Sequence, residues 1–288
     1  MENKLSLIWV YLRGWPKGHT SFRLKPDTDI NELIMLIRNF KIICSLGFIF
    51  ILATAFLQDK KIRVYLIGDS TMANKETKAF PETGWGMPFA YFFDSTVVVD
   101  NRARNGRSTK SFLSENLWQQ VINNLKPGDY VFIQFGHNDE VKEKTDRYTT
   151  PDEYKSNLKR FIQETRDKKG IPILLTPVTR RNFDKEGKIE ETHLVYSGLV
   201  REVALETRVA FIDMDKKSRE LLQQFGETNS KLLYLQLQPG ENPNYPQGKN
   251  DNTHFNELGA RKMAEIVLAE VRLLQIELAS HIVKPKVK

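Results

Sequence analysis

Residues 62–73 read IRVYLIGDSTMA, and they contain the first expected strand together with the turn that follows it. Its first part, Arg63 to Ile67, is a nearly continuous apolar run, which is typical of a β-strand buried on both faces. Gly68-Asp69-Ser70-Thr71 follows at once, so we expect the strand to end in a tight turn that carries a serine. That serine can cap the next helix, or it can present a nucleophilic hydroxyl at the positive N-terminus of the helix. Taken alone, the turn leaves both interpretations of Ser70 open.

Four further runs have the same apolar character, and we expect them to be strands of the same sheet: Val97 to Asp100, Tyr130 to Phe135, Ile171 to Thr176 and Val209 to Asp213. Amphipathic stretches lie between and after them, and we expect helices at Ser111 to Leu125, Asp152 to Lys169, Leu194 to Thr207 and Asn256 to Ala279. Because strands and helices alternate, the crossovers should be right-handed and helices should cover both faces of the sheet. The predicted fold class is therefore α/β, a three-layer α/β/α sandwich with a five-stranded parallel sheet of the flavodoxin-like type.

In such a fold the reactive groups collect at the carboxyl ends of the strands. The loop NRARNGRS, residues 101–108, contains Gly106, where the missing Cβ lets backbone N–H groups approach a ligand. The loop GHND, residues 136–139, carries Asn138, an uncharged amide donor. Each feature also has an ordinary explanation, a plain turn for the first and a helix-capping asparagine for the second.

The segment DNTH, from Asp251 to His254, is the most informative of the polar segments, and we expect it on a turn that opens the last long helix. A carboxylate three residues before the histidine can accept the Nδ1–H bond and leave Nε2 free to deprotonate a serine. With Ser70 the chain order is Ser, Asp, His, as in α/β-hydrolases, but no Gly-x-Ser-x-Gly elbow surrounds Ser70. The sequence therefore predicts a serine hydrolase of another type, with Ser70, Asp251 and His254 as its catalytic residues.

The composition excludes several classes of protein. Of the 288 residues, 40% are hydrophobic and 27% are charged, which rules out a disordered, collagen-like or multi-span membrane chain. The formal net charge is +7, and no dense basic run with interleaved aromatic residues indicates a nucleic-acid groove. The basic excess fits either a solvated surface or attraction to an anionic substrate. Because Cys44 is the only cysteine, neither an intramolecular disulfide nor a cysteine-rich metal site can form.

The N-terminal part of the chain has the pattern of an export signal. Arg38 and Lys41 precede an apolar stretch from Ile42 to Leu57, and Ala53-Thr54-Ala55 supplies small residues for a cleavage point. The stretch is short for a bilayer span of about 20 residues, although an uncleaved anchor stays open as the alternative. The predicted organisation is an upstream extension or cytoplasmic tail at 1–34, a signal peptide or membrane anchor at 35–57, and a single domain at 58–288. Periplasmic or extracellular export is the expected location, with membrane anchoring as the alternative.

The segments GDST, NRARNGRS, GHND and DNTH, in this order and at predicted strand ends, resemble the four blocks of the SGNH or GDSL hydrolase superfamily. Within this superfamily, the chain looks like the rhamnogalacturonan acetylesterase family of carbohydrate esterases. The likeness lies in the segments GDSTMA, the GWG at 84–86, NRARNGRSTKSF, FGHND and DNTHFNELGA. Phe255 departs from the superfamily pattern, in which proline often follows the histidine. This departure should alter the turn and leave the chemistry intact.

The resemblance implies a role for each block. It makes Ser70 the nucleophile, Gly106 and Asn138 oxyanion donors beside the Ser70 N–H, His254 the base and Asp251 its partner. An acetyl-enzyme would form on the serine and then be hydrolysed. The chemistry needs no metal and no organic cofactor.

Substrate contacts are less clearly indicated. Trp85 of the GWG turn can stack on a sugar or pack in the core. Arg107 lies in the glycine loop and, with Arg102, Arg104, Arg180 and Arg181, can form a basic rim for galacturonate carboxylates or remain solvated. We assign Trp85, Arg107 and His137 to substrate binding. No residue is assigned to a metal, because His137 and Asp139 lack a third convergent ligand.

The sequence thus predicts an exported serine esterase that removes acetyl groups from an acetylated polysaccharide, with rhamnogalacturonan as the first candidate. The alternatives are another esterase or lipase of the superfamily, such as a xylan acetylesterase or thioesterase, and an inert carbohydrate-binding protein. No nucleic-acid partner is expected, and a membrane partner only if the apolar segment is uncleaved. The sequence does not determine the oligomeric state, or whether the stretch Gln236 to Asn250 closes over the substrate.

Overall fold

The computed structural model describes residues 34–35, 37–42 and 61–284. By its internal contacts the chain divides into two units, Met1–Asp59 and Lys60–Lys288. In the first unit, residues 34–35 and 37–42 are helical and exposed. The rest of the expected extension at 1–34 and of the expected signal or anchor at 35–57 lies outside the described residues. Within the described ranges, no helix combines the length and the apolar character that crossing a membrane requires.

The second unit is built on a sheet of five parallel strands: β1 (Ile62–Gly68), β2 (Val97–Asn101), β3 (Tyr130–Gln134), β4 (Ile171–Leu175) and β5 (Ala210–Ile212). Their order is β2-β1-β3-β4-β5, which is the flavodoxin-like order. Winding reverses between β1 and β3, so the carboxyl ends of these two strands form the crevice where such folds bind ligands. The predicted fold class is confirmed.

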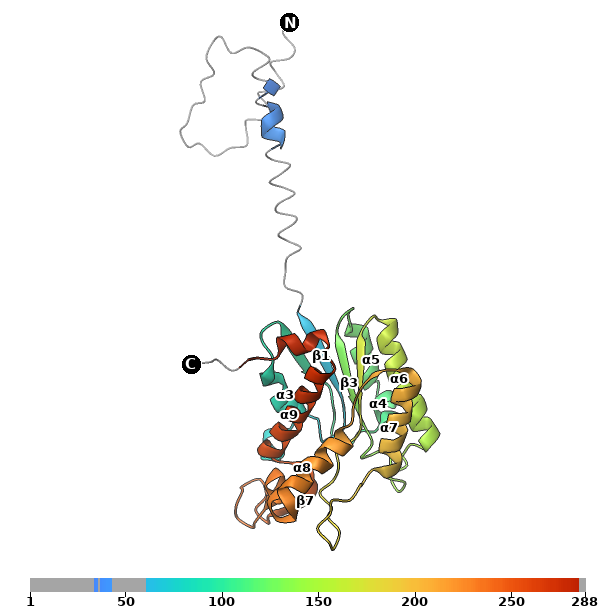
Figure 1. Ribbon diagram of the computed structural model, residues 1–288, viewed down its shortest axis with the longest axis vertical. Helices are drawn as coiled ribbons and strands as arrows, with labels where there is room; N and C mark the ends of the chain where they lie inside the picture. Colours follow the sequence, from blue (N-terminus) through green and yellow to red (C-terminus); the bar gives the residue numbers. More distant parts are fainter. Residues whose placement is uncertain (1–33, 36, 43–60, 285–288) are drawn as a thin grey trace. The chain divides into compact units, whose positions relative to one another are not determined.

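Successive side chains of each strand point to opposite faces of the sheet and enter two separate cores. Val64 and Leu66 belong to one core, and Tyr65 and Ile67 to the other. The first face is covered by α3 (Gly86–Phe89), α8 (Met214–Asn229) and α9 (Glu257–Leu273), and the second by α4 (Thr109–Ser114), α5 (Leu117–Asn124), α6 (Pro151–Asp167) and α7 (Leu194–Thr207) (Figure 1). Short 3₁₀ turns complete the unit: η1 (Thr77–Ala79), η2 (Ala90–Phe92), η3 (Ser230–Leu233) and η4 (Glu277–His281).

Two predicted helices are divided or shortened by residues in the left-handed backbone region. The helix expected at 111–125 is two helices, α4 and α5, because Asn116 between them has φ 56°. The helix expected at 256–279 ends at Leu273, and Gln275, with φ 53°, separates it from η4. Helix α7 has the predicted bounds.

The DNTH segment lies in a strand, so the prediction that it opens the last helix is wrong. Strands β6 (Tyr234–Leu237) and β7 (Lys249–Phe255) form a separate antiparallel pair, and Asp251 to His254 belong to β7. Helix α9 begins only at Glu257, after Asn256, whose side chain caps it by accepting a hydrogen bond from the Gly259 N–H at 3.0 Å. Phe255, at the end of β7, is buried and packs against Tyr234, so it fills the core where the superfamily often has proline.

Candidate active site

Ser70 lies on the turn directly after β1. Asp69 shapes this turn, because its Oδ1 accepts hydrogen bonds from the Thr71 N–H at 2.9 Å and the Thr71 hydroxyl at 2.8 Å. The Asp69 carbonyl also accepts a bond from the Ala73 N–H at 3.0 Å. The Ser70 hydroxyl does not cap the following turn but lies 3.0 Å from Nε2 of His254.

His254 and Asp251 complete a chain of hydrogen bonds that begins at the serine. Nδ1 of His254 lies 2.8 Å from Oδ2 of Asp251. The other oxygen of Asp251 accepts hydrogen bonds from the N–H groups of Thr253, at 2.8 Å, and His254, at 2.9 Å. A carboxylate that accepts the Nδ1–H leaves Nε2 as the acceptor for the serine proton. The structure therefore brings the three residues predicted as catalytic together in the order that acyl transfer needs.

The carboxyl group of Asp251 stays ionised in this arrangement. Burial by itself raises the pKa of Asp251, but the hydrogen bond and electrostatic interaction with His254 and the two backbone N–H groups outweigh it. Together they hold the pKa of Asp251 well below its usual range. The aspartate can therefore orient the imidazole and stabilise its protonated form over the ordinary pH range.

Gly106 and Asn138, the predicted oxyanion donors, are linked through their neighbours. Gly106 has φ +73°, a backbone conformation that favours glycine. Asn138 Nδ2 donates one hydrogen to the Arg107 carbonyl at 3.0 Å, and its Oδ1 lies 3.4 Å from Arg147 Nη1. Since an amide nitrogen carries two hydrogens, the second one stays available to a ligand.

The backbone N–H groups of Ser70 and Gly106 are also available. Within the part of the chain that the structure describes, no atom accepts a hydrogen bond from either of them. Buried or half-buried N–H groups without a partner are rare in folded proteins. Here they stand beside a serine that is hydrogen-bonded to a histidine, which is where a negatively charged oxygen would form.

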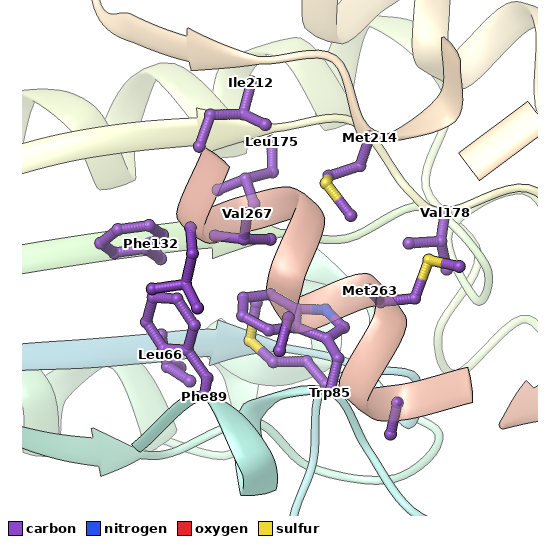
Figure 2. Close-up of a cluster of buried hydrophobic side chains, with 14 of the residues drawn as sticks. Leu66, Trp85, Phe89, Phe132, Leu175, Val178, Ile212, Met214, Met263 and Val267 are labelled. Carbon is purple, nitrogen blue, oxygen red and sulfur yellow. The ribbon is translucent and has the colours of Figure 1, made fainter. Parts of the chain in front are cut away.

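Trp85 does not bind sugar, and the prediction that it forms a stacking platform is wrong. Its side chain is fully buried in the core between the sheet and α9 (Figure 2), and its Nε1 donates to Gln134 at 2.8 Å. The flanking glycines explain the GWG pattern instead. A Cβ on Gly84 would lie 2.1 Å from the Ala73 carbonyl, and one on Gly86 would lie 2.6 Å from the Met72 carbonyl. The pattern thus lets this turn pack directly against the nucleophile turn.

His137 and Arg107, the other two residues assigned to substrate, are engaged within the protein. His137 is only 5% exposed and packs against His193, with 4.3 Å between ring centroids and 46° between the ring planes, so it offers no surface to a sugar. Burial holds the pKa of His137 well below its usual value, which keeps the ring neutral. Arg107 pairs with Glu115 at 2.9 Å and donates from Nη1 to the Asn105 carbonyl at 3.0 Å.

Most of the expected basic rim is also neutralised. Arg102 pairs with Asp100, and Arg180 pairs with Glu140 at 2.8 Å. Arg181 is buried and holds β7 through the side chain of Asn252 at 3.0 Å. Arg104 is exposed, and its guanidinium has no partner among the described residues.

Asp139, which directly follows Asn138 and was not assigned to a metal, has a structural role. Asp139 is fully buried, and its Oδ1 accepts hydrogen bonds from the Thr109 N–H, the Thr109 hydroxyl and the Thr149 hydroxyl. Burial raises the pKa of Asp139 to about 7. Among the described residues, no group of three or more His, Cys, Asp or Glu side chains could hold a metal ion.

Two residues of the site carried no signal in the sequence. Lys75 reaches the Ser70 carbonyl with Nζ at 2.7 Å, and Arg147 reaches Asn138 from a loop between β3 and α6. Both act through long side chains whose targets are fixed by the fold and not by local spacing. Only a prediction of how the loops meet could have found them.

The family model described as "GDSL-like Lipase/Acylhydrolase family" matches residues 66–262, which contain all five residues predicted as catalytic or oxyanion residues. The chain belongs to this family. The resemblance to the SGNH or GDSL superfamily is thereby confirmed, and the chain is a carboxylic ester hydrolase.

Individual relatives agree with the family match. "Rhamnogalacturonan acetylesterase RhgT" of Bacillus subtilis is 38% identical over 227 residues, which are 79% of this chain and 97% of that protein. "Probable rhamnogalacturonan acetylesterase YesY" of the same species is 34% identical, over 77% of this chain and 98% of that protein. Among solved structures, the B. subtilis protein YxiM superposes with a TM-score of 0.66 and 25% identity, covering 76% of this chain and 58% of that chain.

Proposed function

We propose that this GDSL-family hydrolase removes acetyl groups from acetylated rhamnogalacturonan through an acetyl-enzyme on Ser70. The observation that carries the proposal is the unbroken chain of hydrogen bonds from Ser70 through His254 to Asp251. It lies at the carboxyl end of β1, beside N–H groups of Ser70 and Gly106 that have no partner in the described chain. This combination of a nucleophile, a base and free donors is what acyl transfer requires.

In the first step the Ser70 oxygen attacks the acetyl carbonyl carbon while Nε2 of His254 takes the hydroxyl proton. The carbonyl oxygen becomes negatively charged and accepts hydrogen bonds from the N–H groups of Ser70 and Gly106 and from the second hydrogen of Asn138 Nδ2. When the tetrahedral intermediate collapses, the C–O bond to the sugar breaks and His254 gives its proton to the departing sugar oxygen. The product is a free sugar hydroxyl and an acetyl ester on Ser70.

In the second step a water molecule gives its proton to His254 and attacks the acetyl-enzyme. The same donors stabilise the second oxyanion, and the proton returns from His254 to the Ser70 oxygen as acetate leaves. Asp251 remains ionised through both steps and stabilises the imidazolium each time it forms. The protein groups that take part in these proton transfers are in contact, Ser70 with His254 and His254 with Asp251.

Two observations support a polysaccharide as the substrate. The curated relatives that match nearly over their whole length are named as rhamnogalacturonan acetylesterases. The surface also has two hollows next to loops of the site, one of 520 Å³ lined in part by Arg104, Asn105 and Arg107, and one of 630 Å³ lined in part by Glu140, Tyr148 and Arg180. We expect sugar units that neighbour the ester to occupy one of these hollows.

The test is acetate release from three substrates under the same conditions: acetylated rhamnogalacturonan, acetylated xylan and an aryl acetate. We expect the highest kcat/KM among the two polymers on rhamnogalacturonan. Release from xylan alone would replace the substrate assignment with a xylan acetylesterase, and hydrolysis of the aryl acetate alone would keep the esterase and remove the polysaccharide. No release from any of the three would favour an inert carbohydrate-binding protein.

We also propose that the enzyme is exported. The support is the sequence pattern of Arg38, Lys41 and the apolar stretch that ends near Ala53-Thr54-Ala55. Mass spectrometry of the N-terminal peptide of the mature protein tests it, and a chain that begins directly after Ala55 is the expected result. A chain that keeps residues 35–57 and sediments with membranes would show an anchor instead.

A further inference from the structure

Lys75 is a buried cation that the steps above do not use. Its side chain is fully buried, and Nζ lies 2.7 Å from the Ser70 carbonyl, 2.8 Å from Asn105 Oδ1 and 2.7 Å from Glu82 Oε1. An ammonium group has three N–H donors and no acceptor, so these three oxygens satisfy it completely. A neutral amine would offer only two hydrogens to the same three acceptors.

The partners of Lys75 come from separate loops of the site. Ser70 lies on the turn after β1, Asn105 lies in the loop after β2, and Glu82 lies in the segment between η1 and α3. Lys75 is thus a direct bridge between the nucleophile turn and the glycine loop. The two loops belong to neighbouring strands, and the oxyanion must be reached from both of them.

Asn105 stands directly before Gly106, so the two share the peptide group whose N–H is the Gly106 donor. The carbonyl of this peptide is also held, because Arg107 Nη1 donates to it at 3.0 Å. In a trans peptide the N–H points opposite to the carbonyl, so a bond that fixes the carbonyl also fixes the direction of the N–H. Arg107 therefore sets the direction of the donor, and Lys75 sets the place of the loop relative to the serine.

Carboxylates surround the ammonium group of Lys75. Burial is the largest influence and lowers the pKa of Lys75 from its ordinary value, while the ion pair with Glu82 and the nearby carboxylates of Asp69 and Asp251 offset part of this effect. Glu82 is itself only 16% exposed in its side chain, so removing the lysine alone would leave a poorly hydrated carboxylate without its partner. A variant that tests Lys75 must therefore change Glu82 as well.

We propose that Lys75 is a positioning residue that fixes the Ser70 nucleophile and the Gly106 N–H at the separation needed to stabilise the oxyanion. The proposal rests on the esterase chemistry proposed above and not on the identity of the polysaccharide. Donors must lie about 2.7 to 3.1 Å from the oxyanion, and a displacement of about 1 Å can cost about 100-fold in rate. A loop that loses its bridge to the nucleophile turn moves on this scale.

The experiment compares wild type with the double variant Lys75→Met/Glu82→Gln, using an aryl acetate and an alkylboronic acid that forms a tetrahedral adduct with the serine. Thermal unfolding first establishes that the double variant is folded at the assay temperature. We expect kcat to fall by about 100-fold, KM to change by less than about threefold, and boronate affinity to weaken in parallel with kcat. This parallel loss is the signature of a geometry made for the transition state.

The matched control is Lys216→Met/Glu220→Gln, which removes an exposed lysine–glutamate pair on α8. This control should keep wild-type kcat and boronate affinity. Asn105→Ala is the second test variant, because Asn105 is exposed and its loss leaves the Lys75–Glu82 pair intact. We expect it to lower kcat and boronate affinity together.

Wild-type kcat and boronate affinity in both the folded double variant and Asn105→Ala would overturn the proposal. A loss that falls on KM while boronate affinity stays unchanged would also overturn it, because the lysine would then serve substrate binding. A wild-type protein that binds boronate but hydrolyses no ester would contradict the proposed function, while the boronate comparison would still decide the role of Lys75.

Discussion

At the scale of single residues, the Asn138 amide donates one hydrogen to the Arg107 carbonyl at 3.0 Å. We propose that its second hydrogen donates to the oxyanion. Asn138→Ala removes that donor, so we expect kcat to fall by about 10² to 10³. Steady-state kinetics on an aryl acetate measure the effect, and Asn123→Ala on the exposed face of α5 is the control, with no expected change. Wild-type turnover in Asn138→Ala would remove this amide from the oxyanion site.

A second prediction at this scale concerns pH. Because burial raises the pKa of Asp139 to about 7, the folded protein holds a proton between about pH 4 and pH 7 that the unfolded chain has released. The free energy of unfolding should therefore fall as pH rises through this window, by about 1.4 kcal/mol per pH unit at most, and level off above it. Asp139→Asn lacks this titration.

Denaturant unfolding of wild type and Asp139→Asn at pH 5 and pH 8 measures the difference. We expect the stability of wild type relative to the variant to be greater at pH 5 than at pH 8, by up to about 3 kcal/mol. An equal difference at both pH values would show that Asp139 does not bind a proton in the folded state over this range.

The sequence could predict the residues whose chemistry the reaction requires, and it could not predict those that hold them. Ser70, Asp251 and His254 meet as expected because the fold brings the ends of β1 and β7 together. Lys75 and Arg147 were missed because their partners lie in other loops. Trp85 was misassigned because a tryptophan beside two glycines looks the same in sequence whether it packs in the core or lies on the surface.

At the scale of elements, helix α6 shows how local sequence determines a boundary. Thr150 and Glu153 form a capping box, in which the Thr150 hydroxyl accepts from the Glu153 N–H at 3.3 Å and Glu153 Oε2 accepts from the Thr150 N–H at 2.8 Å. We expect Thr150→Ala to lower the free energy of unfolding by about 1 kcal/mol and Tm by about 2 to 4 °C. Activity should be unchanged, since Thr150 touches no residue of the site.

Differential scanning calorimetry of this variant is compared with Thr145→Ala. Thr145 is exposed, and its hydroxyl makes no hydrogen bond within the described part of the chain. A Tm for Thr150→Ala equal to that of Thr145→Ala would mean that the capping box adds nothing to stability.

Strands and helices differ in how well the sequence predicted them. The five strands of the parallel sheet were recognised because they are short runs of mostly apolar residues, and α7 because its pattern is uninterrupted. Strand β7 was taken for the approach to a helix, since its residues KNDNTH are polar and half exposed and lack the alternation of a buried strand. The break at Asn116 was missed because a left-handed asparagine inside an amphipathic pattern leaves no gap in the apolar residues.

At the scale of the whole molecule, the division of the chain into two units leads to a prediction about stability. The unit Lys60–Lys288 has its own two-sided core around the five-stranded sheet. We therefore expect a chain that starts at residue 58 to have the Tm and the aryl-acetate kcat of the full chain. A clearly lower Tm in the shortened chain would show that residues 1–57 stabilise the hydrolase unit.

We propose that Ser70 of this GDSL-family hydrolase carries the acetyl group from a polysaccharide to water. Acetate release from acetylated rhamnogalacturonan is measured for wild type and for Ser70→Ala, together with intact-protein mass spectrometry of a wild-type sample quenched in acid during turnover. We predict release by wild type, loss of release in the variant, and a single acetyl group on Ser70 in the quenched sample. Release that persists in Ser70→Ala would show that Ser70 is not the nucleophile.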